Sequence, residues 1–299
     1  MKRVFAIVLS LIIIVSACVC ASAANIDRTV TGEKVVITDG DWAYTKVSNY
    51  GYQIDSYLGS AANVTIPLSF AREYVTSIGD FAFNENSTLT TLTTTGRIES
   101  IGSYAFNGCT SLKTVKLYDS LTTLGVGCFY GDSALKSVNL SDTSISAVSP
   151  YCFAECGIPT MRLPDTCQSI GHYAFLNCSE LLRIDIPASV TEIDDTAFNG
   201  CDKLIIVCPE GSTAAQYAEA KGIDYITNEN LLMGDVNGDN KVNIRDVTFI
   251  QLYRVGLYDL VDNKAFLRSD VDRNGVVNIR DATNIQLHLV ELIPDLNNI

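Results

Sequence analysis

The chain has 299 residues, of which 47% are hydrophobic and 18% charged, and its formal net charge at pH 7 is −13. This length suffices for one large domain and one small one. The acidic excess argues against nucleic acid and anionic membranes as partners, because both would repel the protein.

The N-terminal segment has the pattern of a secretory signal peptide. Lys2 and Arg3 precede an apolar run over residues 4–15, broken only by Ser10, and small residues follow through Ala24. The run is too short and wrongly flanked for a membrane span. We therefore predict a signal peptide over residues 1–24 and a secreted protein. Residues 15–18 also resemble a bacterial lipoprotein box, so a lipid anchor on Cys18 is the minor alternative.

Residues 25–77 are predicted to form an N-terminal cap with entry strands at 52–54 and 64–67. Five aromatic residues gather in this segment: Trp42, Tyr44, Tyr50, Tyr52 and Tyr57. They have two interpretations. They cover the open end of the first coil of the domain that follows, or they form a platform for stacking on sugar rings.

Residues 78–208 contain six copies of one hydrophobic sequence motif, which is called the phrase below. Each copy ends in a phenylalanine, and these are Phe83, Phe106, Phe129, Phe153, Phe175 and Phe198, spaced 23, 23, 24, 22 and 23 residues apart. A leucine and a short strand pattern follow in most units, as in residues 112–117. A period near 23 with such strands predicts a leucine-rich-repeat solenoid, a curved stack of short parallel strands in which each unit buries its apolar face against its neighbours.

The wording of the phrase, Ile-Gly-x-Tyr/Phe-Ala-Phe-x-x-Cys-x-x-Leu, resembles the bacterial surface-antigen leucine-rich repeats of the treponemal type. The resemblance extends over about residues 50–225. It implies protein contacts at cell surfaces and no catalysis by the repeats.

The ten cysteines fall mostly in repeat positions. Four of them, Cys109, Cys156, Cys178 and Cys201, stand three residues after a phrase phenylalanine. Cysteine buries readily as a small apolar residue, which favours a buried ladder of free thiols. Coils stacked about 4.8 Å apart would also bring neighbouring cysteines within disulfide range, so a Cys178–Cys201 bridge stays open.

Residues 209–225 are predicted to cap the other end of the solenoid. Ser212 or Thr213 can cap a helix over residues 214–221, which Gly222 would end. Residues 226–232 read as a brief linker without a Pro, Thr or Gly tract. We therefore expect the C-terminal module to lie close to the solenoid.

That module, predicted over residues 233–294, contains two loops that repeat each other at an offset of 35 residues, with 13 identities in 23 positions. Both fit the EF-hand spacing, which supplies calcium ligands from positions 1, 3, 5, 7, 9 and 12. The first loop supplies Asp235, Asn237, Asp239, the Lys241 carbonyl, Asn243 and Asp246; the second supplies Asp270, Asp272, Asn274, the Val276 carbonyl, Asn278 and Asp281. We predict two structural Ca²⁺ ions.

Position 6 of such a loop must turn sharply, and it is Asn240 in one loop and Gly275 in the other, residues that tolerate a left-handed backbone. A helical pattern follows each loop, which predicts a helix that starts at position 12. The apolar residues expected on one face are Val247, Ile250 and Leu257 in the first helix, and Ala282, Ile285, Leu289 and Leu292 in the second.

A duplicated loop-plus-helix unit without an entering helix resembles a dockerin of the type found in fibre-degrading gut anaerobes. The resemblance implies a cohesin domain of a scaffold protein as partner, within a cellulosome that degrades polysaccharide. The implied cohesin-binding residues are Ile244, Arg245, Gln251 and Leu252 in one half, and Ile279, Arg280, Gln286 and Leu287 in the other. Because the two sets are identical, we hypothesise that either half can face the cohesin.

Together these patterns predict a secreted, non-catalytic cellulosome-type component: a solenoid for protein or surface binding, followed by a small all-α dockerin. The alternative is a carbohydrate-binding accessory protein. A glycoside hydrolase is less favoured, because the adjacent carboxylates Asp194 and Asp195 fill a variable repeat position. The two histidines, His172 and His288, also fill variable positions, and no nucleophile motif accompanies them.

Overall fold

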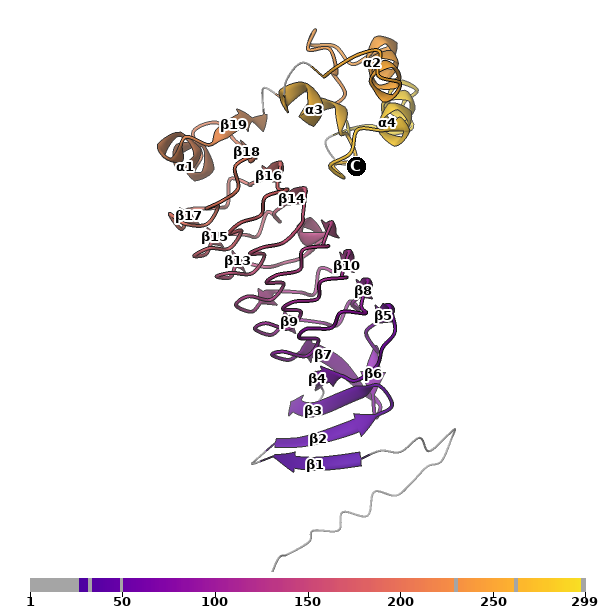
Figure 1. The fold of residues 1–299 in the computed structure, drawn as a ribbon, viewed down its shortest axis with the longest axis vertical. Helices are drawn as coiled ribbons and strands as arrows, with labels where there is room; N and C mark the ends of the chain where they lie inside the picture. Colours follow the sequence, from indigo (N-terminus) through magenta and orange to yellow (C-terminus); the bar gives the residue numbers. More distant parts are fainter. Residues whose placement is uncertain (1–26, 32–33, 49–50, 229–230, 261–262, 297–299) are drawn as a thin grey trace, which may run out of the picture.

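The computed structural model describes residues 27–296, except 32–33, 49–50, 229–230 and 261–262. The predicted signal peptide and Cys18 lie outside the described residues. Within the described part of the chain, every helix is too short or too polar to cross a membrane. The molecule is an elongated solenoid with a β-meander at one end and a small helical module at the other (Figure 1).

The N-terminal end is an antiparallel meander of four strands. These are β1 (Asp27–Thr31), β2 (Lys34–Asp39), β3 (Trp42–Ser48) and β4 (Gly51–Tyr57). β4 then pairs in parallel with β7 (Glu73–Ile78), and the short β6 (Ser69–Phe70) pairs with β7 in the antiparallel sense. The predicted entry strand 52–54 lies within β4, whereas β1 to β3 were not predicted.

The aromatic residues of this end cover the first coil. The Trp42 ring lies 4.8 Å from the Tyr57 ring and 6.1 Å from the Phe83 ring, measured between centroids. Tyr44 and Tyr52 are buried around Phe70. This arrangement matches the capping interpretation and leaves Trp42 only half-exposed.

Each coil of the solenoid contributes two short strands, one to each of two parallel stacks. One stack runs through β7, β9 (Ser100–Ile101) and β11 (Thr123–Leu124), then β13 (Ala147–Val148), β15 (Ser169–Ile170) and β17 (Glu192–Ile193). The other runs through β5 (Asn63–Thr65), β8 (Thr91–Thr93), β10 (Thr114–Lys116) and β12 (Ser137–Val138), then β14 (Thr160–Arg162), β16 (Arg183–Asp185) and β18 (Ile205–Cys208). The predicted leucine-rich solenoid is confirmed.

The core of the solenoid is a ladder of stacked rings. The six phrase phenylalanines are buried, and neighbouring ring centroids lie 4.9 to 5.5 Å apart. The predicted burial of the cysteines is confirmed for the eight described ones, which are free thiols in this structure. Cys109, Cys156, Cys178 and Cys201 each donate to the carbonyl of the phenylalanine one coil earlier, at 2.9 to 3.1 Å. The repeat therefore buries a polar S–H group together with an acceptor for it.

The strand pairing of both stacks is interrupted in the fourth unit, where the phenylalanine spacing is 24. A short 3₁₀ helix, η1 (Leu140–Asp142), follows β12 there. In the regular coils the N–H of Lys136 donates to Lys113 and that of Leu182 donates to the Pro159 carbonyl. Pro159 occupies the equivalent position in the fourth unit and has no N–H to donate, so the ladder breaks between β12 and β14.

The C-terminal end of the solenoid is capped by helix α1 (Thr213–Lys221). Ser212 accepts a hydrogen bond from the Ala215 N–H, and Gly222 ends the helix at a φ of 67°, both as predicted. Strand β19 (Asp224–Thr227) then adds to β18 in parallel. The expected linker therefore begins about two residues later than predicted.

The C-terminal module contains helices α2 (Ile244–Arg254), α3 (Asn263–Ser269) and α4 (Ile279–Leu289). Helices α2 and α4 lie side by side, away from the solenoid (Figure 1). Val247, Ile250, Ala282 and Ile285 are buried between them, as predicted. The prediction of a unit without an entering helix was wrong for the second loop, because α3 leads directly into it.

Candidate metal centres and binding surfaces

The two loops fold their backbones around the carboxylate at position 1. The Asn240 N–H donates to Asp235 Oδ2 at 2.9 Å, and the Gly275 N–H donates to Asp270 Oδ2 at 2.8 Å. Asn240 and Gly275 adopt φ angles of 63° and 79°. The predicted left-handed turn at position 6 is therefore confirmed in both loops.

The carboxylate at position 12 ties each loop to its helix. Asp246 accepts from the Asn243 N–H at 2.8 Å and from the Val236 N–H at 2.9 Å. Asp281 accepts from the Asn278 N–H at 2.8 Å. The asparagine at position 9 and the aspartate at position 12 form a capping box in each loop, with the asparagine as the N-cap. Each helix therefore begins at position 10, and the prediction that it begins at position 12 was wrong.

The second loop gathers three carboxylates. Ligand oxygens of Asp270, Asp272 and Asp281 all lie within 4.8 Å of one another. Burial, with neighbouring carboxylates adding to it, raises the pKa of Asp270 to about 7 and that of Asp281 to about 6. In the first loop, burial likewise raises the pKa of Asp246. Crowded, buried carboxylates of this kind are stabilised by a bound divalent cation.

The other predicted ligands complete an all-oxygen set. Asn237 and Asp239 in the first loop, and Asn274 in the second, accept hydrogen bonds from N–H groups two residues later at 2.8 to 3.0 Å. The side chains of Asn243 and Asn278 accept in the same way from the N–H groups of Arg245 and Arg280, which lie at the helix starts. Asn278 also donates to the Val276 carbonyl at 2.8 Å. Carboxylate, amide and carbonyl oxygens suit a hard cation such as Ca²⁺, and a bound ion would neutralise the loop carboxylates.

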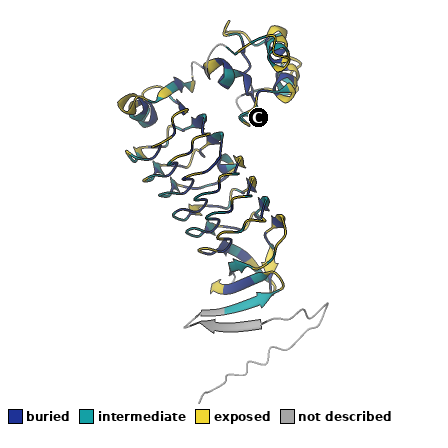
Figure 2. Ribbon diagram, viewed as in Figure 1, coloured by how far each residue is buried: buried dark blue, intermediate teal, exposed yellow. Residues whose placement is uncertain are grey.

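The predicted cohesin-binding residues form matching surfaces on the two halves. The side chains of Ile244 and Ile279 are each 61% exposed. The arginine and glutamine of each set are exposed as well, and the two leucines, Leu252 and Leu287, are half-buried. Figure 2 shows exposed positions along α2 and α4. The structure therefore presents both sets to solvent.

Sequence reasoning misplaced three leucines. Leu257 and Leu292 are 76% and 71% exposed, and Leu289 is 37% exposed, although all three were expected on the buried face. Helices α2 and α4 end before Leu257 and Leu292, and left-handed residues at Gly256 and Glu291 turn the chain away from the helical path. With Val255 and Val290, which are also exposed, these residues add a second matching apolar patch to each half.

The solenoid carries a row of aromatic side chains that sequence reasoning also missed, exposed at Phe81 and half-buried at the other three positions. Phe81, Tyr104, Tyr151 and Tyr173 occupy one position of the phrase, and all adopt φ between 53° and 58°. With Asn107 and Tyr130, the first three of these line a hollow of about 440 Å³. A left-handed backbone is costly for bulky residues, on the order of 1 kcal/mol each. The recurring Tyr/Phe before Ala-Phe was the available signal.

A polar cluster near the end of the solenoid brings His172, Asp194 and Thr196 together. His172 Nδ1 lies 3.3 Å from an Asp194 oxygen and 2.8 Å from Thr196 Oγ1. Both contacts use the same ring nitrogen, so the imidazole does not bridge a hydroxyl and a carboxylate as in a nucleophilic triad. Hydrogen bonds from Thr196, with His172 contributing, lower the pKa of Asp194, opposite to the shift that a general acid requires.

Comparison with known families matches two regions of the chain. Residues 76–205 match the BspA type leucine rich repeat region in six copies, and residues 233–290 match the dockerin type I domain. The chain joins a BspA-type repeat region to a type I dockerin. Both are non-catalytic kinds of domain. A search of curated proteins finds no match.

Similar solved structures are bacterial leucine-rich-repeat proteins. A leucine rich cell surface protein from Faecalibacterium prausnitzii A2-165 is 26% identical over 58% of this chain and 54% of its own, with a TM-score of 0.46. The T. pallidum leucine rich repeat protein is 18% identical over 63% of this chain and 97% of its own, with a TM-score of 0.41. This chain thus spans about half the length of the first protein.

Proposed function

We propose that this protein is a secreted, non-catalytic adaptor of a cellulosome-type complex. Its dockerin binds two Ca²⁺ ions and then a cohesin domain of the scaffold, and its solenoid binds a second protein. The observation that carries the proposal is the pair of matching loop-and-helix units, each with buried loop carboxylates and an exposed recognition surface. The dockerin and repeat regions are both surface and assembly modules, which supports an extracellular location.

Calcium has a structural role in this proposal. The dockerin core is small, and its loops hold buried carboxylates that repel one another. A module with so little core gains its folding free energy from metal binding. The ordered helices α2 and α4 then present Ile244 or Ile279 to the cohesin, each at the exposed start of its helix.

Calorimetry with a panel of type I cohesins tests the first half of the proposal. The mature chain should bind at least one cohesin with calcium and none with a chelator. Replacing Ile244 and Arg245 by Ala should leave the affinity nearly intact, and so should replacing Ile279 and Arg280, whereas the fourfold variant should lose binding. A large loss from one pair alone would show that a single half binds.

The aromatic row is the best-supported partner surface of the solenoid. Tyr and Phe side chains are enriched at protein interfaces because they bury much area at little cost in conformational entropy. The amount of partner protein that is cross-linked to the solenoid should fall when Tyr104 and Tyr151 are both replaced by Ser. Replacing Tyr118, which follows β10 in the other stack, is the matched control. Retention on insoluble polysaccharide that Trp42→Ala abolishes would instead support the carbohydrate-binding alternative.

A further inference from the structure

The last repeat strand differs from the earlier strands of its stack. Outward-facing positions are polar in the earlier coils, as in Thr91 and Thr93 of β8 or Thr114 and Lys116 of β10. In β18 the equivalent positions are Ile205 and Val207, and the whole strand is buried. Ile206 and Cys208 belong to the solenoid core, whereas Ile205 and Val207 belong to the core of the dockerin. A strand that is covered on both faces has apolar residues at successive positions instead of alternating apolar and polar ones, and β18 has this pattern.

The apolar contact continues into the start of the dockerin. Ile226 of β19, Leu231 and Met233 lie in the same cluster as Val236, Val247 and Ile250 of the dockerin. The core of the dockerin therefore extends onto the flank of the solenoid, and the residues between them are part of it.

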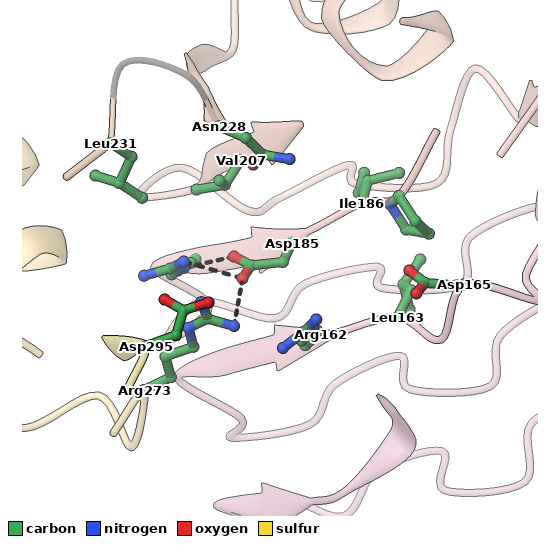
Figure 3. Close-up of a pocket in the computed structure, with 12 residues that line it drawn as sticks. Arg162, Leu163, Asp165, Asp185, Ile186, Val207, Asn228, Leu231, Arg273 and Asp295 are labelled. Atoms are coloured by element: carbon green, nitrogen blue, oxygen red, sulfur yellow. Dashed lines mark hydrogen bonds and ion pairs between the residues drawn. The ribbon is translucent and has the colours of Figure 1, made fainter. Parts of the chain in front are cut away.

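An ion-pair cluster fixes the second calcium loop beside this apolar contact. On β16, Arg183 is 2% exposed and donates to both carboxylate oxygens of Asp185, at 2.5 and 2.9 Å. Arg273, at position 4 of the second loop, lies 3.3 Å from Asp185 Oδ2 (Figure 3). Arg183 also lies 3.7 Å from the sulfur of Met233. Asp185 thus contacts one guanidinium from each domain.

The loop backbone also touches the solenoid. Thr160 Oγ1, on β14, donates to the Arg273 carbonyl at 2.5 Å. A Cβ at Gly275 would lie 2.7 Å from the Pro159 side chain, so position 6 of the loop rests against the start of β14. The contacted loop residues are therefore Arg273, which lies between the loop ligands Asp272 and Asn274, and Gly275, which follows Asn274.

The first loop has a different environment at the same positions. Its residue at position 4 is Gly238, which carries no side chain to reach the solenoid. A Cβ there would meet Arg268 of the dockerin itself, and Arg268 donates to the Asp235 carbonyl at 2.7 Å. The two loops are alike in sequence and ligands, yet the described contacts attach only the second one to the repeats.

We propose that the outer flank of β14, β16 and β18 is a binding surface for the second calcium loop, so that calcium binding in this loop and docking of the dockerin on the solenoid strengthen each other. The inference rests on the calcium binding proposed above for that loop. Calcium orders the loop whose Arg273 carbonyl accepts from Thr160 and whose Arg273 side chain pairs with Asp185, and docking holds the same loop in its binding conformation. By linkage, each event must favour the other by the same factor.

The test is a calcium titration of the full mature chain, with the backbone amide NMR signals of Gly238 and Gly275 reporting the first and second loops separately. Arg273→Gly gives the second loop the residue that the first loop has at this position, and a left-handed φ of 54° suits glycine. Thr160→Val replaces the hydroxyl by a methyl group of similar size, in a solenoid residue far from the calcium ligands in sequence. Thr114→Val, at the equivalent and exposed position of β10, is the matched control.

We expect Arg273→Gly to weaken calcium binding at Gly275 by roughly 5-fold or more, with Gly238 unchanged. Thr160→Val should weaken it less, in the same direction, and Thr114→Val should have no effect. Small-angle X-ray scattering should show the chain expanding when calcium is removed and in the Arg273→Gly variant. Equal Gly275 affinities in all four proteins, or equal weakening of both loops, would overturn the linkage while leaving calcium binding intact. No response of either glycine to calcium would overturn the proposed function as well.

Discussion

The solenoid and the dockerin are held together by different means. The solenoid repeats one apolar unit, so each coil buries its phenylalanine and leucines against the next, and caps cover both ends. The dockerin has a much smaller core, and it holds Asp235, Asp246, Asp270 and Asp281 almost fully buried. Stacking of similar coils is enough to order a repeat domain. In the proposed function, the small module depends instead on an ion that its own carboxylates attract.

The largest effect should come from calcium removal. With a chelator, the dockerin should lose most of its helical circular dichroism and all measurable cohesin binding, because the buried carboxylates would repel one another without the ion. The solenoid should keep its own thermal unfolding transition. A chelated protein that retains the helical signal of α2 and α4 would contradict the assignment of structural calcium.

The next largest effect should come from a mutation that leaves the dockerin unchanged and creates a cavity in the middle of the phenylalanine ladder of the solenoid. Phe129 is fully buried between Phe106 and Phe153, at centroid distances of 5.2 and 5.4 Å. Phe129→Ala should destabilise the solenoid by about 3–5 kcal/mol in denaturant unfolding, because the cavity cannot close between two fixed coils. Calcium-dependent cohesin binding should survive below the new midpoint. Loss of both together would show that the two domains unfold as one unit.

A third change separates the two loops. Asp246→Asn and Asp281→Asn each remove one charge from position 12 while keeping an acceptor for the cap. Each should weaken calcium binding of its own loop by at least about tenfold, or about 1.4 kcal/mol. Only Asp281→Asn should also expand the chain in solution scattering, since the ion pair and hydrogen bond described between a calcium loop and the repeats come from the second loop. Equal expansion by both variants would contradict that asymmetry.

Much of the fold follows from spacing alone. The period near 23 predicts the solenoid because each unit must stack, and the loop spacing predicts the backbone at Asn240 and Gly275 because position 6 has to turn. Helix α1 follows from Ser212 and Gly222. In each case one local rule decides the local structure.

What spacing could not predict depends on contacts between distant segments. Leu257 and Leu292 continue the helical pattern in sequence, but the helix ends before them. The meander of β1 to β3 has no repeat signal. The apolar outward positions Ile205 and Val207 were visible in the sequence, yet their meaning depends on a dockerin that folds back onto them. The sequence pattern shows which face of a strand or helix is apolar, and the structure shows which segment packs against that face.

A pH-dependent effect is expected from the carboxyl group that is buried in the solenoid core among the described residues. Asp132 is fully buried and accepts from the Cys109 N–H at 2.7 Å, and burial raises its pKa to about 9 from an ordinary value of 3.8. Between these pH values the folded state keeps a proton that the unfolded state loses. The free energy of unfolding should therefore fall as pH rises through this window, by at most about 1.4 kcal/mol per unit.

Asp132→Asn should flatten that pH dependence, because an amide does not titrate, and should stabilise the solenoid relative to the natural chain more at pH 8 than at pH 5. Urea unfolding at pH 5 and pH 8 measures both effects, with the exposed Asp119→Asn as control. In the proposed function a calcium ion would neutralise the buried carboxylates of the dockerin, whereas the raised pKa of Asp132 predicts that a proton neutralises this one in the solenoid. A variant whose stability follows the same pH slope as the natural chain would show that Asp132 stays ionised in the folded state.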